Sequence, residues 1–219
     1  MFSTQPAAGI LQYLLQTHDP RAIIVVGSYA DNSFDETSDF DAWIFGRDPD
    51  RVRLDTSVVN HVPLCVKIYP PRSYETADPE VMKVFAGAAI AYDPEGLARK
   101  FLDRVQESLS RYPCLSPQDK RKKIGILKSL LCRARKQDFD GDHRGHMLLS
   151  DSLETWCDLS DRIYLGTRKT LRMMEQEDPE SAAIYRRALR SFAVEDMQAW
   201  VDRLCTVYEA SSRRTYRRL

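Results

Sequence analysis

Two aspartates on alternate positions of a short apolar run are the residues in this sequence best suited to chemistry. Asp39 and Asp41 belong to the run Asp39–Phe45. Because successive side chains of a β-strand point to opposite faces, we expect both carboxylates on the same face. Mg2+ is bound in proteins through one or two carboxylates, and phosphate oxygens and water complete its ligand set. The pair therefore predicts a magnesium site with Asp39 and Asp41 as metal ligands.

A pair of small residues upstream suggests what that magnesium would accompany. Gly27-Ser28 directly follows a run of β-forming residues, Ala22–Val26, and ten residues separate Ser28 from Asp39. A glycine lets the backbone come close to a phosphate, and a serine adds a hydroxyl and an N–H group. Either half alone is most often an ordinary turn. Joined across a short loop between two predicted strands, the halves predict a site that binds a nucleoside triphosphate with its metal.

The order Gly-Ser, spacer and Asp-x-Asp resembles the polymerase-β-like nucleotidyltransferase superfamily. The resemblance implies an α/β N-terminal nucleotidyltransferase domain, with a small mixed sheet flanked by helices, followed by an all-α helical C-terminal domain. It also implies Mg-dependent transfer of a nucleoside monophosphate, AMP from ATP, to a hydroxyl, with release of pyrophosphate. Asp39 and Asp41 would be the catalytic metal ligands, and Gly27 and Ser28 would hold the β- and γ-phosphates.

The superfamily usually supplies a third carboxylate from the next strand, and this sequence departs from that pattern. The matching stretch is Leu64–Tyr69, where the candidates on the same face are Cys65 and Lys67. Three explanations are open. Another acid substitutes, such as Glu75 or one from the helical half; the enzyme works with two carboxylates; or the protein binds nucleotide without turnover. The plainer interpretation of Lys67 is a lysine on the surface or on an edge strand.

The stretch Trp156–Lys169 resembles the helical domain of aminoglycoside-type nucleotidyltransferases, the small-molecule adenylyltransferase branch. In that domain a helix lining the acceptor site ends in a turn, and a lysine then reaches the triphosphate. Lys169 is the matching position. In some branches a glutamate of the helical domain is the general base, which must come within hydrogen-bond reach of the acceptor hydroxyl. The candidate in this sequence is Glu154.

A run of acids at helical spacing surrounds that glutamate. The default interpretation of such a run is a solvated helix face. An acidic face with Trp156 and Tyr164 nearby also suits a polycationic, hydroxylated acceptor such as an amino-sugar, with Asp151 and Asp158 as acceptor contacts. The acids of this run are Asp151, Glu154, Asp158 and Asp161.

The elements that would position these residues change character halfway along the chain. In the first half, apolar periodicity and β-forming runs predict a helix, three strands, an ambiguous segment read as a short helix, a helix followed by a short strand ending at Tyr92, and a helix opened by Asp93. These elements cover Ala8–Gln16, then Ala22–Val26, Phe40–Phe45 and Pro63–Tyr69, then Arg51–Val59, Val81–Ala91 and Asp93–Ser110.

Beyond Tyr112–Pro117 the strand signals stop, so this stretch is the predicted boundary between a nucleotidyltransferase domain, residues 1–112, and a helical domain, residues 117–219. Ser116 and Asp178, each followed by proline, are predicted to cap helices. Residues Asp138–Asp142 are expected to form a turn, and a long helix is expected to follow over His146–Leu165. Gly166 ends or interrupts it.

Composition limits the class of protein. The 219 residues are 43% hydrophobic and 29% charged, which is typical of a globular chain. Lys plus Arg and Asp plus Glu both number 32, so the overall charge gives no support for binding nucleic acid or an acidic membrane. The five cysteines form no C-x-x-C pair and are expected to be reduced thiols. No apolar run reaches transmembrane length, so a cytoplasmic location is expected.

The leading hypothesis is therefore AMP transfer from ATP to a hydroxyl of a small, aminoglycoside-like molecule. One alternative is a nucleotide-binding or regulatory protein that has lost the chemistry, which the missing third acid favours. Another is nucleotidyl transfer to a protein or RNA. The basic run Lys120–Lys123 favours that alternative, because it could meet phosphates, and the neutral overall charge disfavours it.

Overall fold

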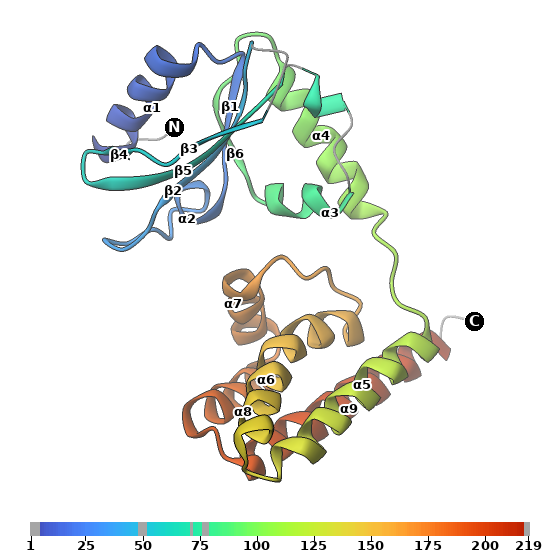
Figure 1. Ribbon diagram of the computed structural model, residues 1–219. Helices are drawn as coiled ribbons and strands as arrows, with labels where there is room; N and C mark the ends of the chain where they lie inside the picture. The colour runs from blue at the N-terminus through green and yellow to red at the C-terminus, as the bar shows by residue number, and fades with distance from the viewer. Residues whose placement is uncertain (1–4, 48–51, 71, 76–78, 217–219) are drawn as a thin grey trace. The chain divides into compact units, whose positions relative to one another are not determined.

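The computed structural model describes residues 5–47, 52–70, 72–75 and 79–216, which form two compact units (Figure 1). The first unit is Met1–Arg111 and the second is Tyr112–Leu219. The first unit combines a mixed sheet with helices, and the second is helical throughout its described residues. The expected fold class, an α/β N-terminal part followed by an all-α C-terminal part, is thus confirmed.

Within the described residues of the first unit, six strands lie among α-helices and two short 3-10 helices. The strand order is β3-β5-β2-β1-β6, and β4 pairs with the first two residues of β5. In chain order the elements are α1 (Gln5–His18), β1 (Ala22–Val25), α2 (Gly27–Ala30), β2 (Phe40–Phe45), β3 (Arg53–Asp55), β4 (Val58–Val59), β5 (Val62–Tyr69), η1 (Ser73–Glu75), α3 (Pro79–Met82), η2 (Lys83–Phe85), β6 (Ala89–Tyr92) and α4 (Leu97–Ser110).

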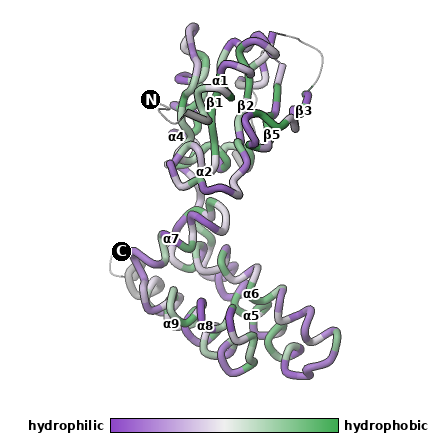
Figure 2. Tube along the Cα trace, turned by 90° about the vertical axis from the view of Figure 1, so that its left-hand side faces the viewer, coloured by the Kyte–Doolittle hydropathy of each residue, from purple (hydrophilic) through white to green (hydrophobic). Residues whose placement is uncertain are grey.

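The sheet is mixed because its two central pairs run differently. Strands β1 and β2 are antiparallel, with Val25 opposite Ala42, whereas β2 and β5 are parallel. The β2–β5 register sets Asp41 opposite Cys65. Strand β5 lies between β2 and β3, so it is an interior strand of the sheet. Figure 2 shows hydrophobic residues along β1, β2 and β5; β1 and β2 are buried on both faces, whereas buried and more exposed residues alternate along β5.

The two faces of this sheet have separate cores because strand side chains alternate. On one face, Ile10 and Leu14 of α1 pack against strand residues that include Ile44 and Val66. On the other face, α3, η2 and α4 cover Trp43 and neighbouring residues of β1 and β2. Asp41 is two residues before Trp43, so it belongs to the face covered by α4.

Two short strands replace the short helix expected over Arg51–Val59, whose first residue lies outside the described part. Strand β3 pairs with β5 on the side that faces away from β2. Where the chain turns from β3 into β4, the Asp55 side chain accepts the Ser57 N–H at 2.9 Å. The hairpin turn that follows has positive φ at both Asn60 and His61, which is characteristic of a type I′ turn. Because the hydrogen-bonding partner of β3 comes from β5, local periodicity could not identify it.

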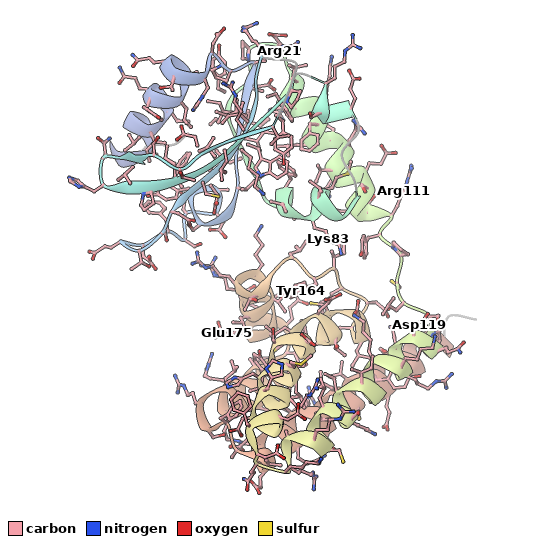
Figure 3. All side chains as sticks on the ribbon, viewed as in Figure 1. Arg21, Lys83, Arg111, Asp119, Tyr164 and Glu175 are labelled. Atoms are coloured by element: carbon pink, nitrogen blue, oxygen red, sulfur yellow. The ribbon has the colours of Figure 1, made fainter. Side chains whose placement is uncertain are left out.

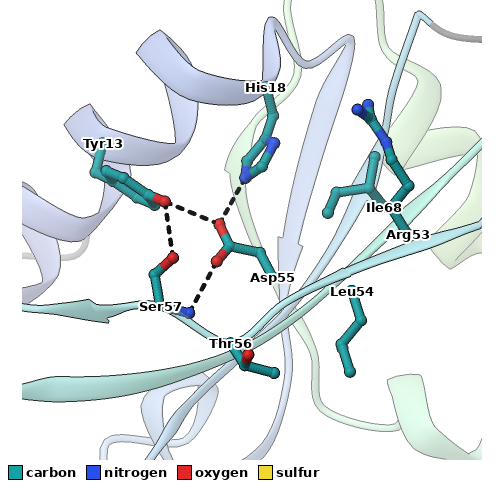
Figure 4. Close-up of a pocket in the computed structure, with 8 residues that line it drawn as sticks. All are labelled: Tyr13, His18, Arg53, Leu54, Asp55, Thr56, Ser57 and Ile68. Carbon is teal, nitrogen blue, oxygen red and sulfur yellow. Dashed lines mark hydrogen bonds and ion pairs between the residues drawn. The ribbon is translucent and has the colours of Figure 1, made fainter.

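A small polar cluster joins α1 to β3 (Figure 4). The Asp55 carboxylate lies 2.7 Å from His18 Nε2, and its Oδ2 accepts a contact from the Tyr13 hydroxyl at 3.2 Å. The Tyr13 hydroxyl also lies 3.0 Å from Ser57 Oγ. Together these side chains line a pocket whose wall includes Ile68 of β5. The cluster lies on the face covered by α1, opposite the face that carries Asp41.

The second unit consists of helices packed around buried aromatic and aliphatic side chains. Trp156 and Trp200 are fully buried, and Trp200 Nε1 donates to Ser152 Oγ at 2.8 Å. Several ion pairs of this unit lie at the surface, such as the one between Arg186 and Glu175, a residue labelled in Figure 3. The helices are α5 (Pro117–Ala134), α6 (Phe139–Leu159), α7 (Thr167–Glu177), α8 (Pro179–Ser191) and α9 (Val194–Tyr216).

Three helices of this unit begin where a side chain caps the free backbone N–H groups of the first turn. Ser116 Oγ accepts the Asp119 N–H, and Asp178 accepts the Ser181 N–H, so both predicted caps are confirmed. The turn expected over Asp138–Asp142 is wrong. Asp138 caps α6 through the Gly141 N–H at 2.8 Å, so the helix begins at Phe139 and ends at Leu159, before the expected Leu165. Among the described helices, none is long and apolar enough to cross a membrane.

Candidate functional site

Asp41 lies against the turn that follows β1. The Val26 N–H donates to the Asp41 carbonyl at 3.0 Å, which brings the end of β1 beside the start of β2. Gly27 has φ +67°, a conformation that favours glycine. A Cβ added to Gly27 would lie 2.9 Å from Asp41 Oδ2. The Asp41 carboxylate is therefore directed at the Gly27 backbone, and the space between them is too small for any side chain.

The four-residue helix α2 holds Ser28 at the same turn. Tyr29 is buried, and its ring stacks on Phe34 at 4.3 Å and contacts Phe40 at 5.0 Å. The Ser28 carbonyl accepts the Ser33 N–H at 2.9 Å. Aromatic packing and this backbone hydrogen bond fix the turn against the start of β2.

Asp39 is exposed and comes directly before β2. Burial raises the pKa of Asp41, and the charge of Asp39 raises it further; a hydrogen bond from Cys65 and the charge of Lys67 act in the opposite direction. The net direction is upward. A cation bound between the two carboxylates would relieve this repulsion.

The position of the missing third acid is occupied by Cys65. Burial, the charge of Asp41 and its hydrogen bond to the thiol, and the charge of Asp39 all raise the pKa of Cys65, so its thiol is a neutral donor to Asp41. Lys67 is on the same face two residues later. The interpretation of Lys67 as a surface or edge-strand lysine is confirmed in its first part, because Lys67 is exposed, and wrong in its second, because β5 is flanked by β2 and β3.

At this turn the described residues offer a cation two carboxylates, those of Asp39 and Asp41. Across the ranges that the structure describes, no group of three or more His, Cys, Asp or Glu side chains is arranged to hold a metal ion. Glu75, an alternative third acid, is exposed on η1, where its carbonyl accepts from Arg104 at 2.9 Å. Asp41 Oδ2 lies beside the Gly27-Ser28 turn, a backbone cradle that an added Cβ would fill. The carboxylate oxygens of Asp39 and Asp41 are donors that fit Mg2+, which needs no further protein carboxylate.

Sequence reasoning did not identify the aromatic platform beside this pair. Trp43 stacks on Tyr69 with ring centroids 4.4 Å apart, and it meets Phe85 edge-on at 4.6 Å. The ammonium of Lys67 lies over the Trp43 ring, 5.2 Å from its centroid. The signal was the alternation itself, because Trp43 follows Asp41 by two residues and therefore shares its face.

In the helical unit, the candidate base Glu154 is exposed and lies 3.3 Å from Lys123 Nζ. The same ammonium lies 2.5 Å from Asp158 Oδ2, which compensates the burial of that oxygen. Burial alone would lower the pKa of Lys123, but Asp158 and Glu154 raise it, so the lysine stays charged. The acidic run of α6 therefore faces a basic residue of α5 here.

A second ion pair joins α5 to the turn that follows α6. Lys120 is buried, and its ammonium lies 2.5 Å from Asp161 Oδ1 and 3.5 Å from the Leu159 carbonyl. Lys122 pairs with Asp119, the residue labelled at the start of α5 in Figure 3. Much of the basic run thus neutralises acids of its own unit, which weakens the argument for a nucleic-acid partner.

The remaining sequence candidates of this unit have mixed environments. Trp156 is fully buried and is therefore a core residue, with Arg162 stacked over its ring at 5.2 Å. Tyr164 is partly buried, and its hydroxyl lies 3.2 Å from Thr167 Oγ1. Asp151 is exposed, and Lys169 is partly buried in the first turn of α7. These residues belong to the second unit, whereas Gly27, Ser28, Asp39 and Asp41 belong to the first.

Comparison with family models shows the family to which this chain belongs. The family model described as "Nucleotidyltransferase domain" matches residues 8–134, a range that includes the turn at Gly27 and both aspartates. A nucleotidyltransferase-like protein from Exiguobacterium sibiricum 255-15 has a crystal structure that is similar with a TM-score of 0.39 and 12% sequence identity, over 93% of this chain and 73% of that chain. Among curated proteins, none matches this chain.

Proposed function

Because the chain belongs to the nucleotidyltransferase domain family, we propose that it transfers a nucleoside monophosphate, AMP from ATP, to a hydroxyl of a small molecule and releases pyrophosphate. The observation that carries the proposal is the approach of Asp41 Oδ2 to the Gly27 backbone, which sets one carboxylate of the pair directly beside the cradle formed by the Gly27-Ser28 turn. A nucleotide's phosphates and their cation need that combination of close backbone and hard oxygen ligands.

Each residue of the cradle has a distinct role in this proposal. Asp39 and Asp41 hold Mg2+, which when bound neutralises negative charge on the phosphates. Gly27 and Ser28 bind the β- and γ-phosphates through the backbone and the serine hydroxyl. Cys65 donates its thiol hydrogen to Asp41 and so orients that carboxylate.

The helical unit supplies the acceptor side of the proposal. Lys169 offsets charge on the departing pyrophosphate, and Glu154 accepts the proton of the acceptor hydroxyl. Glu154 would have to exchange its contact with Lys123 for one with the acceptor, because a base must be within hydrogen-bond reach. An aminoglycoside-like acceptor would contact Asp151 and Asp158. Because Asp158 is paired with Lys123, its charge is compensated within the protein, and the support for a polycationic acceptor is weaker.

A second candidate function is nucleotide binding without turnover, in a regulatory role. The observation that favours it is the neutral Cys65 in register with Asp41, where a third acid is absent. Both candidates require Mg-nucleotide binding, so they differ in whether pyrophosphate is released.

The test combines isothermal titration with a transfer assay. The whole chain is titrated with Mg2+ and a non-hydrolysable ATP analogue, and then incubated with ATP carrying a label on the α-phosphate and a panel of hydroxylated compounds that includes aminoglycosides. We expect binding, pyrophosphate release and label on a small molecule, all lost in Asp39→Asn and Asp41→Asn.

Each other outcome has a defined meaning. Absence of Mg-nucleotide binding by the wild-type chain would refute both candidates. Binding without release across the panel would favour the regulatory protein. Label that appears on protein or RNA when cell extract replaces the panel would identify a macromolecular acceptor.

A further inference from the structure

We propose that Lys67 supplies a second positive charge to the bound triphosphate, so that this site operates with a single Mg2+ and a lysine in place of two metal ions. The inference rests on the proposed function and deepens it. It concerns a residue that the motif of Gly27, Ser28, Asp39 and Asp41 does not include.

Strand register brings Lys67 to the carboxylate pair. Asp41 is opposite Cys65, and Trp43 is opposite Lys67, in parallel strands β2 and β5. Two residues of a strand span roughly 7 Å, so Lys67 is one side-chain step along the sheet from Cys65, on the same face as Asp41. The Lys67 charge acts on Asp41 and lowers its pKa against the larger upward influences of burial and Asp39.

The platform under Lys67 is rigid, and its ammonium is accessible. Trp43 is only 9% exposed and is held between Tyr69 and Phe85. Lys67 itself is exposed, and its Nζ lies 5.2 Å from the Trp43 ring centroid. Among the residues that the structure describes, no carboxylate forms an ion pair with Lys67. A lysine engaged by a tryptophan ring can exchange that contact for a phosphate oxygen without breaking a salt bridge.

The charges and ligands at the site favour one metal ion. Paired metal ions at phosphoryl-transfer sites lie roughly 3.5–4 Å apart. Two ions so close require enough anionic ligands, yet the residue opposite Asp41 on β5 is Cys65 and not an acid, and the described residues contain no group of three or more His, Cys, Asp or Glu arranged to hold a metal ion. A Mg-bound triphosphate still carries negative charge beside Asp39 and Asp41, and a lysine ammonium binds phosphate as a point charge.

The experiment counts metal ions and measures nucleotide affinity in the full chain. Mn2+ bound per chain is measured by electron paramagnetic resonance in the presence of a non-hydrolysable ATP analogue. The dissociation constant of the Mg-analogue complex is measured by isothermal titration for wild type, Lys67→Met, Lys67→Arg and Lys100→Met. Lys100 is an exposed lysine of α4 and serves as the matched control. Circular dichroism checks that each variant is folded.

We expect one Mn2+ per wild-type chain and affinity weakened about tenfold or more in Lys67→Met, as for loss of a hydrogen bond to a charged group. Lys67→Arg should restore most of the affinity, and Lys100→Met should match wild type. Two Mn2+ per chain, or unchanged affinity in Lys67→Met, would overturn the inference while leaving the proposed function intact. Failure of the wild-type chain to bind the Mg-analogue would instead refute the proposed function.

Discussion

At the scale of single residues, Asp41 combines partial burial with a like-charged neighbour. Both influences raise the pKa of Asp41 above that of an exposed aspartate. The ionised form is therefore penalised in the folded protein, and this penalty applies at any pH above the folded pKa. As the pH falls through that pKa, protonation removes it. A bound cation would remove it at neutral pH.

Replacing Asp41 by asparagine should have opposite effects on stability and on Mg-nucleotide binding. Asp41→Asn should raise the melting temperature at pH 7 without metal, because the penalised charge is gone, and the difference from wild type should shrink as the pH falls through the raised pKa of Asp41 towards about 4, the ordinary aspartate value. Mg2+ with nucleotide should raise the melting temperature of wild type but not of the variant. Differential scanning calorimetry measures both effects.

The control for this prediction is Asp103→Asn, which changes an exposed acid of α4. It should leave the response to Mg2+ and nucleotide as in wild type. An Asp41→Asn protein that melts at a lower temperature than wild type at pH 7 would contradict the argument that the Asp41 charge is penalised.

At the scale of elements, the turn between β1 and β2 depends on a glycine for two separable reasons. Gly27 has φ +67°, and its missing Cβ leaves room for Asp41. Gly96, before α4, has a nearly identical φ of +70° but nothing within 4 Å of an added Cβ. The two glycines therefore form a matched pair. A side chain at Gly96 would suffer only the strain of a positive φ, whereas a side chain at Gly27 would also meet Asp41.

We predict that Gly96→Ala destabilises the protein by about 1–2 kcal/mol, the cost of a left-handed conformation for a residue with a Cβ. Gly27→Ala should cost more and should also abolish Mg-nucleotide binding, because its methyl group would displace Asp41 Oδ2. Adding Asp41→Ala should recover the extra stability loss but not the binding. Equal losses in the two single variants, measured by urea denaturation, would show that the Asp41 contact is unimportant.

The link between α1 and β3 is a second element-scale device. Burial alone would raise the pKa of Asp55, but hydrogen bonds from Ser57, His18 and Tyr13 together lower it. A lowered carboxyl pKa contributes stability that is complete above the ordinary aspartate range and is lost as the pH falls through the folded pKa. The cluster should therefore fix the end of α1 to the sheet at neutral pH and release it in acid.

Asp55→Asn should accordingly destabilise the protein at pH 7 by about 1–3 kcal/mol, because three donors lose their charged acceptor. The difference from wild type should diminish as the pH falls below about 4. Tyr13→Phe removes one of the donors and should cost less. Denaturant titrations between pH 3 and pH 7 test this. A loss that is constant over that range would argue against an ionised Asp55.

At the scale of the whole molecule, each unit has its own core. The first unit buries two apolar layers on the faces of its sheet, and the second buries Trp156 and Trp200 among its helices. The acids and bases of α5 and α6 pair within the second unit. Each unit therefore contains the packing and charge compensation that a folded domain needs.

We predict that residues 1–111 and residues 112–219, expressed separately, each unfold cooperatively. Thermal unfolding followed by circular dichroism and amide dispersion in NMR spectra measure this. The helical fragment should keep its buried Lys120–Asp161 pair, so that Lys120→Met destabilises it. A fragment that is unfolded alone but folds when mixed with the other would show that the two cores depend on each other.

Much of the fold could be predicted from local signals. The β-branched and aromatic runs of β1 and β2 needed no long-range information, because they are buried on both faces and read as largely apolar segments, and β5 was recognisable from its β-forming residues although one of its faces carries the exposed Lys67. Ser116-Pro117 and Asp178-Pro179 mark helix starts by their own chemistry. The sequence also held the order and spacing of Gly27, Ser28, Asp39 and Asp41, from which a metal and phosphate site was inferred.

Tertiary structure decided the features whose partners are distant in the chain. Strand β3 exists because β5 offers it hydrogen bonds, and that pairing makes Lys67 an interior-strand residue beside Trp43. The sequence predicts a solvated acidic face, with Glu154 as a candidate base and Asp158 as an acceptor contact, whereas the fold places Lys123 of α5 against both. A sequence shows which charges and strands a protein has, but folding decides which of them meet, because contacts depend on distances in space rather than along the chain.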